Sequence, residues 1–364
     1  MPRSIVVVGS GIVGCAIARE LAVRGMACAV YDDRPVAGGA TQASAGMLAP
    51  YVEAHERTPM HDLCVRSLVL YDEWVDAVRA ESAMEVEYRR VGTLEVAFDS
   101  AEAARLRAAA ERSEDVVRVW LDSEAVRREH AAIGDVAGGL FTAVHGYVAA
   151  PQLAAALAAS AQRHGAALHR APVERIDRVR SSLRVTTATG QVHADVVVLA
   201  AGAWTNAIAG VRTPPVRPIR GQLLHLGPLE RSLATIVWGP ECYIVPRTDG
   251  SLLVGATVED VGFDERATAA GVRDLLDAAC DLLPGAWGAS FLDARVGMRP
   301  ATPDELPVIG PDSEVDGVVH ASGHYRNGVL LAPITGRLIA DWIADGTRDP
   351  AFDTFRSDRF PASA

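Results

Sequence analysis

The segment IVVVGSGIVG, residues 5–14, decides how the N-terminal region folds. Its β-branched run predicts a buried strand, and the apolar periodicity after the glycines predicts a helix. Between them, Gly9 is expected to make the tight turn, Gly11 to let the backbone approach a pyrophosphate, and Gly14 to let the helix pack closely on the strand. A helix N-terminus also attracts phosphate charge. The segment therefore predicts a dinucleotide site rather than a purely structural glycine turn.

A second strand, expected over residues 27–31, completes a βαβ unit with a buried parallel sheet. Asp32 ends this strand 18 residues after Gly14, where a carboxylate accepts hydrogen bonds from ribose hydroxyls. For the neighbouring Asp33, the sequence pattern alone favours a solvated turn carboxylate. The small residues at 38–48 suit close contact with a large flat ligand and its pyrophosphate, which favours FAD over a nicotinamide dinucleotide.

Composition narrows the class of protein. The 364 residues carry a net charge of −11, and 49% of them are hydrophobic, as in ordinary globular chains. The acidic balance argues against nucleic acid and anionic membranes as partners, because both attract basic patches. All 35 basic residues are arginine. Without lysine, the chain has neither the Schiff-base lysine of pyridoxal phosphate enzymes nor the phosphate-binding lysine of a P-loop.

The cysteine pattern indicates a reducing environment. Five cysteines are present and no two form a CxxC pair: Cys15, Cys28, Cys64, Cys242 and Cys280. This disfavours a disulfide framework and a zinc site, so no metal is expected and a cytoplasmic location is predicted. The apolar N-terminus faintly resembles a signal peptide but lacks a convincing cleavage site. No apolar run reaches the roughly 18 residues of a membrane span, so no membrane partner is expected.

Periodicity along the rest of the chain predicts a mixed order of elements. Helices are expected at 60–82, 100–112, 152–164, 268–283 and 333–344. Strands are expected at 91–98, 192–200 and 317–321, and residues 213–258 indicate several antiparallel strands punctuated by proline and glycine.

This order predicts an α/β protein (α+β overall) with two discontinuous domains. A Rossmann-type FAD-binding domain is expected over 1–83, 146–215 and 296–364. A substrate-binding domain built on an antiparallel sheet is expected over 84–145 and 216–295.

Longer motifs extend this interpretation. They are GSGIVG at 9–14, TQASAGML at 41–48, RGQ at 220–222, ECYIVPR at 241–247, GMRPATPD at 297–304, LPVIGP at 306–311 and GHYRNGVLLAP at 323–333. With these motifs the chain resembles the D-amino-acid oxidase superfamily of FAD enzymes nearly end to end. Within it, the chain is most similar to the glycine oxidases of thiamine thiazole synthesis. The last motif is the most specific, because a bare FAD fold would not predict it.

The resemblance implies a set of residues that bind FAD without a covalent bond, since no cysteine lies in the C-terminal flavin-facing loop. Val173 is expected against the adenine. The implied FAD-binding residues are Gly9, Gly11, Val13, Gly14, Asp32, Asp33, Thr41, Gln42, Ala45, Gly46, Met47, Val173, Gly202, His324, Tyr325, Arg326, Asn327, Gly328, Val329 and Leu330.

Oxidation of an amino acid by flavin requires a fixed cation for the substrate carboxylate, and the arginine fork matches a carboxylate. The resemblance assigns this role to Arg299, with Tyr243 as a hydroxyl donor to the same carboxylate. It also implies that Arg326 lies near both substrate and flavin. The alternative for Arg299 is a surface arginine paired with Asp304, and Arg295 is interpreted as structural.

The resemblance therefore implies oxidative deamination of a small amino acid, by hydride transfer to flavin N5. Glycine, oxygen and water would give glyoxylate, ammonia and hydrogen peroxide. The expected partners are the amino acid and oxygen, and a homo-oligomer is an open alternative because the family often forms tetramers. A sarcosine oxidase or a D-amino-acid or proline dehydrogenase would keep the fold. A non-catalytic flavoprotein subunit and a nicotinamide dehydrogenase are alternatives from other classes.

Overall fold

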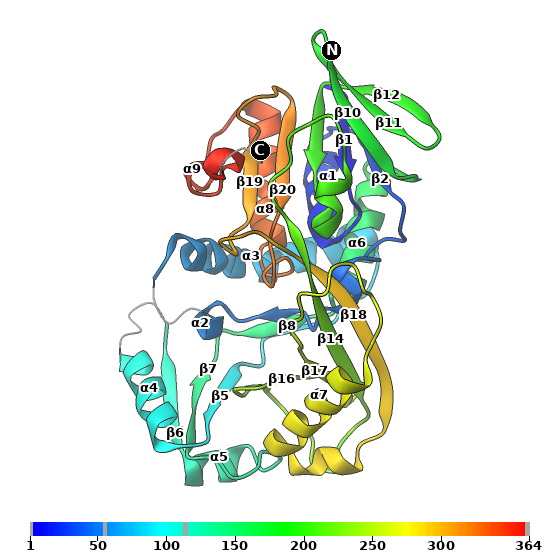
Figure 1. The fold of residues 1–364 in the computed structure, drawn as a ribbon. Coiled ribbons are helices and arrows are strands. Elements are labelled where there is room, and N and C mark those ends of the chain that lie inside the picture. Colours follow the sequence, from blue (N-terminus) through cyan, green and yellow to red (C-terminus); the bar gives the residue numbers. More distant parts are fainter. Residues whose placement is uncertain (1–2, 54–56, 112–115, 361–364) are drawn as a thin grey trace.

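The computed structural model describes residues 3–53, 57–111 and 116–360 (Figure 1). Its N-terminal segment forms β1 (Ile5–Val8), which lies between β2 (Cys28–Asp32) and β13 (Val196–Leu199) and is parallel to both. The six-stranded sheet runs in the order β19-β20-β13-β1-β2-β9. Its other strands are β9 (Ala167–Arg170), β19 (Val308–Pro311) and β20 (Val318–Ser322), and β19 pairs antiparallel.

Both faces of this sheet are covered, which explains the uninterrupted apolar run of β1. Ile5 and Val7 pack among helices α1 (Ile12–Val23), α3 (Pro59–Ser82), α6 (Ala150–Arg163) and α8 (Ala332–Asp345). Val6 and Val8 pack on the other face, against a three-stranded sheet. That sheet contains β10 (Val173–Val179), β11 (Ser182–Thr187) and β12 (Gly190–Ala194). A strand buried on both faces has no need of polar alternation.

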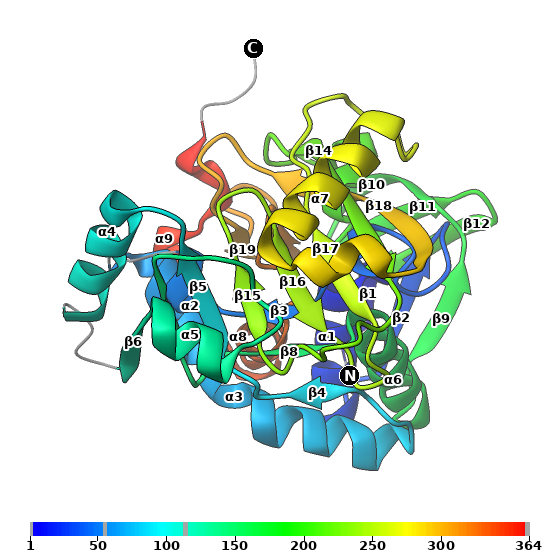
Figure 2. The same cartoon turned by 90° about the horizontal axis from the view of Figure 1, so that it is seen from below.

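An eight-stranded sheet forms the lower half of the view in Figure 1. It runs in the order β18 (Phe291–Ala301), β14 (Arg217–Leu226), β17 (Leu252–Gly255), β16 (Tyr243–Pro246), β15 (Ile236–Trp238), β5 (Thr93–Ala97), β7 (Gly138–Thr142) and β6 (Arg118–Asp122). All neighbouring strands are antiparallel except β15 and β5. Helix α7 (Ala269–Leu282) lies across one face, and its leucines share a core with β14 and β17 (Figure 2).

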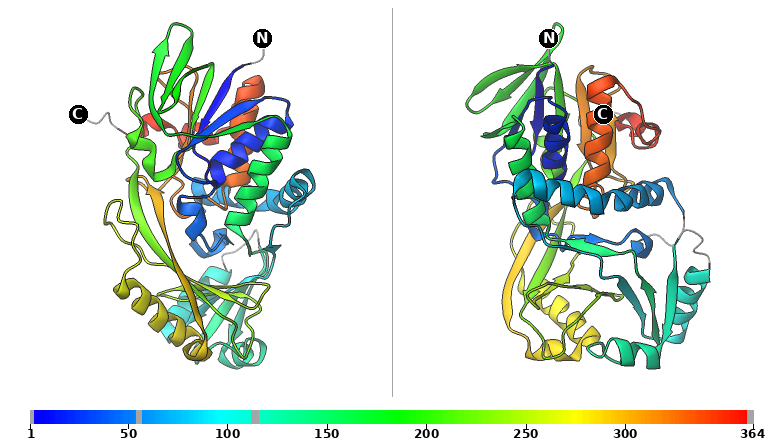
Figure 3. Two further views of the ribbon diagram at one scale, coloured as in Figure 1. Left: turned by 90° about the vertical axis from the view of Figure 1, so that its right-hand side faces the viewer. Right: turned by 180° about the vertical axis from the view of Figure 1, so that it is seen from behind.

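Short elements complete the fold. A third sheet holds β3 (Met47–Leu48), β4 (Tyr88–Arg89) and β8 (Gly146–Val148). The remaining helices are α2 (Pro50–Glu53), α4 (Ser100–Glu111), α5 (Ser123–Glu129) and α9 (Ala351–Thr354), with 3-10 turns η1 (Ala40–Ala43), η2 (Gly202–Ala207), η3 (Pro284–Gly288) and η4 (Ser357–Arg359). The long strands β14 and β18 run from the level of the six-stranded sheet down to the far end of the molecule (Figure 3).

One predicted strand is wrong. Residues 192–200 form not a single strand but the end of β12 and all of β13, which belong to different sheets. The chain changes sheet at Asp195, whose carboxylate accepts hydrogen bonds from the backbone N–H and the hydroxyl of Ser4. The predicted helices agree with the structure to within a few residues at each end.

The two large sheets can be compared with the predicted two-domain division, whereas the small sheet of β3, β8 and β4 draws on segments of both predicted domains. All six strands of the parallel-type sheet lie within 1–83, 146–215 and 296–364, whereas β18 runs across the predicted boundary at residue 295. We keep the division as a proposal, with β18 shared between both domains. In the part of the chain that the structure describes, no helix is both long and apolar enough to cross a membrane.

Candidate active site

One pocket of about 540 Å³ connects the carboxyl end of β1 with the eight-stranded sheet. It gathers residues that lie far apart in the sequence. Of the predicted site residues, its lining includes Gly9, Gly11, Val13, Asp32, Asp33, Thr41, Ala45, Gly46, Met47, Val173, Gly202, Tyr243, Arg299, His324, Tyr325, Arg326, Asn327, Gly328, Val329 and Leu330. Gly14 and Gln42 are not part of the lining. Gln42 is exposed, and Gly14 faces the strand behind the pocket.

The glycine loop has the geometry that a pyrophosphate needs. Gly9 has φ +108°, and a Cβ there would come within 2.3 Å of the Ala200 carbonyl oxygen. A Cβ on Gly14 would lie 1.9 Å from the Gly9 carbonyl oxygen, so this glycine permits the helix to approach the loop. Gly11 is the N-cap of α1 and offers no side-chain acceptor to the first turn. The first-turn N–H groups of Val13 and Gly14 therefore suit an anionic ligand.

Asp32 binds other residues of the protein, a role that its sequence position does not predict. Its Oδ2 accepts hydrogen bonds from the N–H and hydroxyl of Ser10, at 2.6 and 2.9 Å, and its Oδ1 accepts from the N–H of Arg34 at 2.8 Å. These bonds hold the glycine loop against the end of β2. The adjacent Asp33 is exposed and lines the same pocket. We therefore propose Asp33 as a ribose partner alongside Asp32.

The segment 324–331 forms another wall and leads directly into α8. His324 is buried, and its Nε2 lies 3.1 Å from the hydroxyl of Thr335. Burial lowers the pKa of His324 to about 4, so this imidazole is neutral at pH 7. Tyr325 has φ +48°, and the Arg326 guanidinium lies over its ring at 4.8 Å. The N-terminus of α8 has no side-chain cap, so its first turn suits negative charge on a ligand.

Arg299 projects from β18 into the pocket and forms no ion pair with any residue in the described ranges. Its Nη1 donates to the carbonyl oxygens of Thr257, at 2.8 Å, and Arg220, at 3.4 Å. The alternative pairing with Asp304 does not occur, because Asp304 binds Arg359 at 2.8 Å. Arg295 pairs with Asp293 at 3.0 Å, as a structural role requires. Within the described ranges no carboxylate pairs with this half-buried guanidinium, which therefore suits an anionic ligand.

Tyr243 enters the pocket from β16. Its ring stacks on Trp238 of the neighbouring strand, with centroids 5.5 Å apart. It also lies over Gly255 of β17, where a Cβ would come within 2.5 Å of the phenol oxygen. The two neighbours fix the orientation of the ring.

Several lining residues were not predicted as site residues, although Glu241 and Met298 lie within the motifs at 241–247 and 297–304. Trp238, Glu241, Ala256, Val258 and Met298 reach the pocket through the register of the eight-stranded sheet and its loops. Trp238 belongs to a short apolar run, and such a run alone carries no signal for a ligand. Cys242 also lines the pocket, but its thiol is buried, and burial with nearby Asp281 and Glu241 raises its pKa to about 12. A thiol of this kind supports the prediction of a non-covalent flavin.

Comparison with known proteins decides the family. The sequence model of the family described as "FAD dependent oxidoreductase" (DAO) matches residues 4–342. The chain belongs to this family. It is 37% identical, over 100% of its own length and 56% of the relative's, to a bifunctional protein ThiO/ThiG of Trichormus variabilis. It is 34% identical to a glycine oxidase of Geobacillus kaustophilus, over 96% of this chain and 94% of that one.

Solved structures agree with this membership of the FAD-dependent family. The crystal structure of glycine oxidase from Geobacillus kaustophilus has a TM-score of 0.94 and 32% identity, covering 99% of this chain and 100% of that one. The chain spans about half the length of the ThiO/ThiG relatives. The pocket fits the FAD of the family, because its lining combines uncapped N–H groups, glycine backbone, an exposed carboxylate and an arginine.

Proposed function

We propose that this FAD-dependent oxidoreductase deaminates a small amino acid, with glycine as the preferred substrate. Glycine, oxygen and water would give glyoxylate, ammonia and hydrogen peroxide. The observation that carries the proposal is Arg299, a carboxylate-free guanidinium in the pocket that also contains the dinucleotide loop. The glycine oxidase named above, 34% identical over nearly all of both chains, supports the same substrate.

Arg299 and Tyr243 would bind the substrate through its carboxylate. The unused edge of the guanidinium offers two parallel N–H donors, which match the two carboxylate oxygens. The Tyr243 hydroxyl adds a third donor from a neighbouring region of the sheet. Binding the carboxylate at fixed points orients the α-carbon toward the 324–330 wall, and orientation of this kind lowers the barrier without any strong acid or base.

When bound, FAD supplies the acceptor for the hydride that leaves the α-carbon. The residues of the chain have the task of keeping the substrate amine neutral and the site dry. Arg326 lines the pocket, and its positive charge disfavours the ammonium form of a nearby amine. His324 adds no charge at pH 7, because burial lowers its pKa to about 4. Met47, Met298 and Trp238 provide apolar surface that excludes water.

We also propose that this oxidation serves thiamine biosynthesis, as the sequence motifs imply. The bifunctional ThiO/ThiG relative, 37% identical, supports this placement.

The proposal is tested by mixing the anaerobic holoprotein with glycine, sarcosine, D-alanine or D-proline and following the flavin absorbance. Bleaching that is fastest with glycine, with colour and hydrogen peroxide returning in air, is the expected result. If only a larger amino acid bleaches the flavin, that amino acid and not glycine is the substrate. Colour that does not return in air would indicate a dehydrogenase.

The role of Arg299 is tested separately by Arg299→Met, with Arg295→Met on the same strand as the matched control. Losing the carboxylate anchor should cost about 3 kcal/mol, or roughly a hundredfold in kcat/KM. Arg295→Met should stay near the parent value, because its side chain pairs with Asp293 outside the pocket. An Arg299→Met variant as active as the parent would contradict the proposal.

A further inference from the structure

The loop between β17 and α7, residues 256–268, contains four carboxylates, and its Thr257 carbonyl binds Arg299. All four are paired with arginines other than Arg299: Glu259 with Arg220, Asp260 with Arg217, Asp264 with Arg220 and Arg266, and Glu265 with Arg34. A guanidinium surrounded by acidic residues would ordinarily capture one of them. Here the acidic residues are distributed so that Arg299 keeps none.

Glu259 is connected to Arg299 through the backbone of Arg220. Its backbone pairs with that of Arg220, with N–H to O distances of 2.8 and 3.0 Å in the two directions. The Arg220 carbonyl that accepts from the Glu259 N–H also accepts from Nη1 of Arg299. Thr257, two residues before Glu259, supplies the second carbonyl partner of Arg299. Glu259 and Arg299 are therefore held by the same Arg220 carbonyl and by neighbouring residues of one loop.

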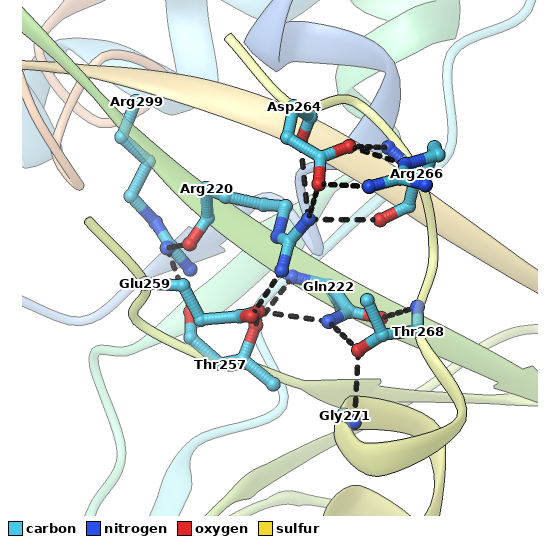
Figure 4. A network of polar contacts seen from close by, with 9 residues as sticks. All are labelled: Arg220, Gln222, Thr257, Glu259, Asp264, Arg266, Thr268, Gly271 and Arg299. Atoms are coloured by element: carbon cyan, nitrogen blue, oxygen red, sulfur yellow. Dashed lines mark hydrogen bonds and ion pairs between the residues drawn. The ribbon is translucent and has the colours of Figure 1, made fainter. Parts of the chain in front are cut away.

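Three donors hold the Glu259 carboxylate on the side directed toward Arg220 and Gln222, away from the Arg299 guanidinium, as Figure 4 shows. Its Oε2 accepts from Arg220 at 2.5 Å, and its Oε1 accepts from Gln222 at 2.8 Å and from the Thr257 hydroxyl at 2.6 Å. Burial alone would raise the pKa of Glu259, but these hydrogen bonds outweigh it and lower that pKa. The carboxylate is therefore ionised, and both of its oxygens accept hydrogen bonds.

Arg220 is the residue on which this arrangement depends. Its side chain is only 5% exposed, and besides Glu259 it binds Asp264 at 3.0 Å and the carbonyls of Asp264 and Arg266 at 3.2 Å. With Arg266, it balances the charges of Glu259 and Asp264, two positive against two negative. Neither of these two carboxylates therefore neutralises the positive charge of Arg299.

Gln222 and helix α7 make the arrangement rigid. Gln222 is fully buried, and its amide oxygen accepts from the N–H of Thr268 at 2.8 Å while its amide nitrogen donates to the Thr268 hydroxyl at 3.0 Å. That hydroxyl caps α7 by accepting from the N–H of Gly271. The loop is thus tied to β14 at one end and to a helix start at the other.

We propose that Arg220 is a positioning residue that holds Glu259 away from Arg299, so that the Arg299 guanidinium stays open for the substrate carboxylate. Without Arg220, Glu259 loses its strongest partner and turns to Arg299, where it acts as an internal competitor of the substrate. The inference rests on the proposed function, because it takes Arg299 as the carboxylate anchor.

The test uses the FAD-loaded protein and acetate, a carboxylate that binds without turnover, with its Kd read from the change in flavin absorbance. Arg220→Met should weaken acetate binding by about tenfold and raise KM for glycine while changing kcat little. The double variant Arg220→Met with Glu259→Gln should recover most of this loss, because the competing charge is gone. Arg266→Met is the matched control. It removes an arginine–carboxylate pair from the same loop but leaves Glu259 bound, so Kd should not change.

Two results would overturn the inference. One is an Arg220→Met variant that binds acetate as tightly as the parent. The other is a double variant as weak as the single one, which would mean that Arg220 serves structure alone. If Arg220→Met does not fold, Arg220→Lys replaces it, because one ammonium group cannot serve all the partners of the guanidinium. It should show a smaller loss, again reversed by Glu259→Gln.

Failure of the proposed function has a different signature. If the Arg299→Met variant binds acetate as tightly as the parent, Arg299 is not the carboxylate anchor and the proposed function is contradicted. Loss of binding in Arg299→Met together with no effect of Arg220→Met would overturn the positioning role alone.

Discussion

Gly221 provides the sharpest test of how the carboxylate anchor is held. It lies on β14 directly beneath Arg299, and its backbone φ is not in the left-handed region, so alanine is compatible with the strand. An alanine Cβ, however, would lie 2.3 Å from Nη1 of Arg299 and 2.5 Å from both Cζ and Nη2. The guanidinium rests flat on the glycine, and Gly221→Ala removes the room for it.

The size of the effect follows from these distances. Ordinary contacts to a Cβ begin near 3.4 Å, so the guanidinium must withdraw by about 1 Å. Misplacement of a binding group by that amount costs about a hundredfold in kcat/KM. The loss should appear mainly in KM for glycine and in the Kd for acetate. Overall stability should change little, because alanine itself fits a strand.

The assay compares kcat/KM, acetate Kd and Tm for the parent, Gly221→Ala and a control. Gly285→Ala is the matched control, because a Cβ there meets nothing within 4 Å and its φ is ordinary. Gly221→Ala within about threefold of the parent, while Arg299→Met loses a hundredfold, would refute the argument that the glycine holds the anchor in place.

Three further predictions concern the cofactor end, the hydroxyl donor and pH. Gly14→Ala should lower both FAD content and Tm, because its Cβ would lie 1.9 Å from the Gly9 carbonyl oxygen; protein that keeps its full yellow colour would contradict this reasoning. Tyr243→Phe should raise KM for glycine about tenfold through loss of one hydrogen bond to a charged group. An unchanged KM would show that the hydroxyl does not bind the substrate. Burial lowers the pKa of His324 from 6.5 to about 4, so the unfolded chain takes up this proton first as the pH falls. Its contribution to stability is therefore complete above about pH 6.5 and is lost progressively toward pH 4, and His324→Gln should flatten the change in Tm over that range. An equally steep profile in the variant would show that His324 does not titrate in this way.

The sequence predicted the parts of the fold that depend on local pattern. The strand, glycine turn and helix of residues 5–23 follow from neighbouring residues alone, and the structure confirms them. The long helices 59–82 and 269–282 were also predicted, because an apolar stripe repeats over many turns. The switch of sheet at Asp195 was missed, since its cause is a contact with Ser4, which lies 191 residues away in the sequence.

The same contrast between local sequence pattern and long-range contact applies to the candidate site. Glycines 9, 11 and 14 carry their role in their spacing, whereas Arg299 is one of 35 arginines and was selected only through its surrounding motif. Whether an arginine is open or paired depends on partners that the fold brings together. No spacing rule predicts that Glu259 and Asp264 are both taken by Arg220. Trp238 likewise enters the pocket only through its register opposite Tyr243.

The ladder between β14 and β18 has a mechanical consequence. Ten residues of β14, from Arg217 to Leu226, pair without interruption up to a single irregularity at His225, and Arg299 belongs to this ladder. At its upper end, β18 also packs against η1 and η2, which line the cofactor end of the pocket. The two halves of the molecule therefore share one continuous ladder, and a hinge motion between them would have to break its hydrogen bonds. The same ladder ties the position of Arg299 to the turns that line the cofactor region of the pocket.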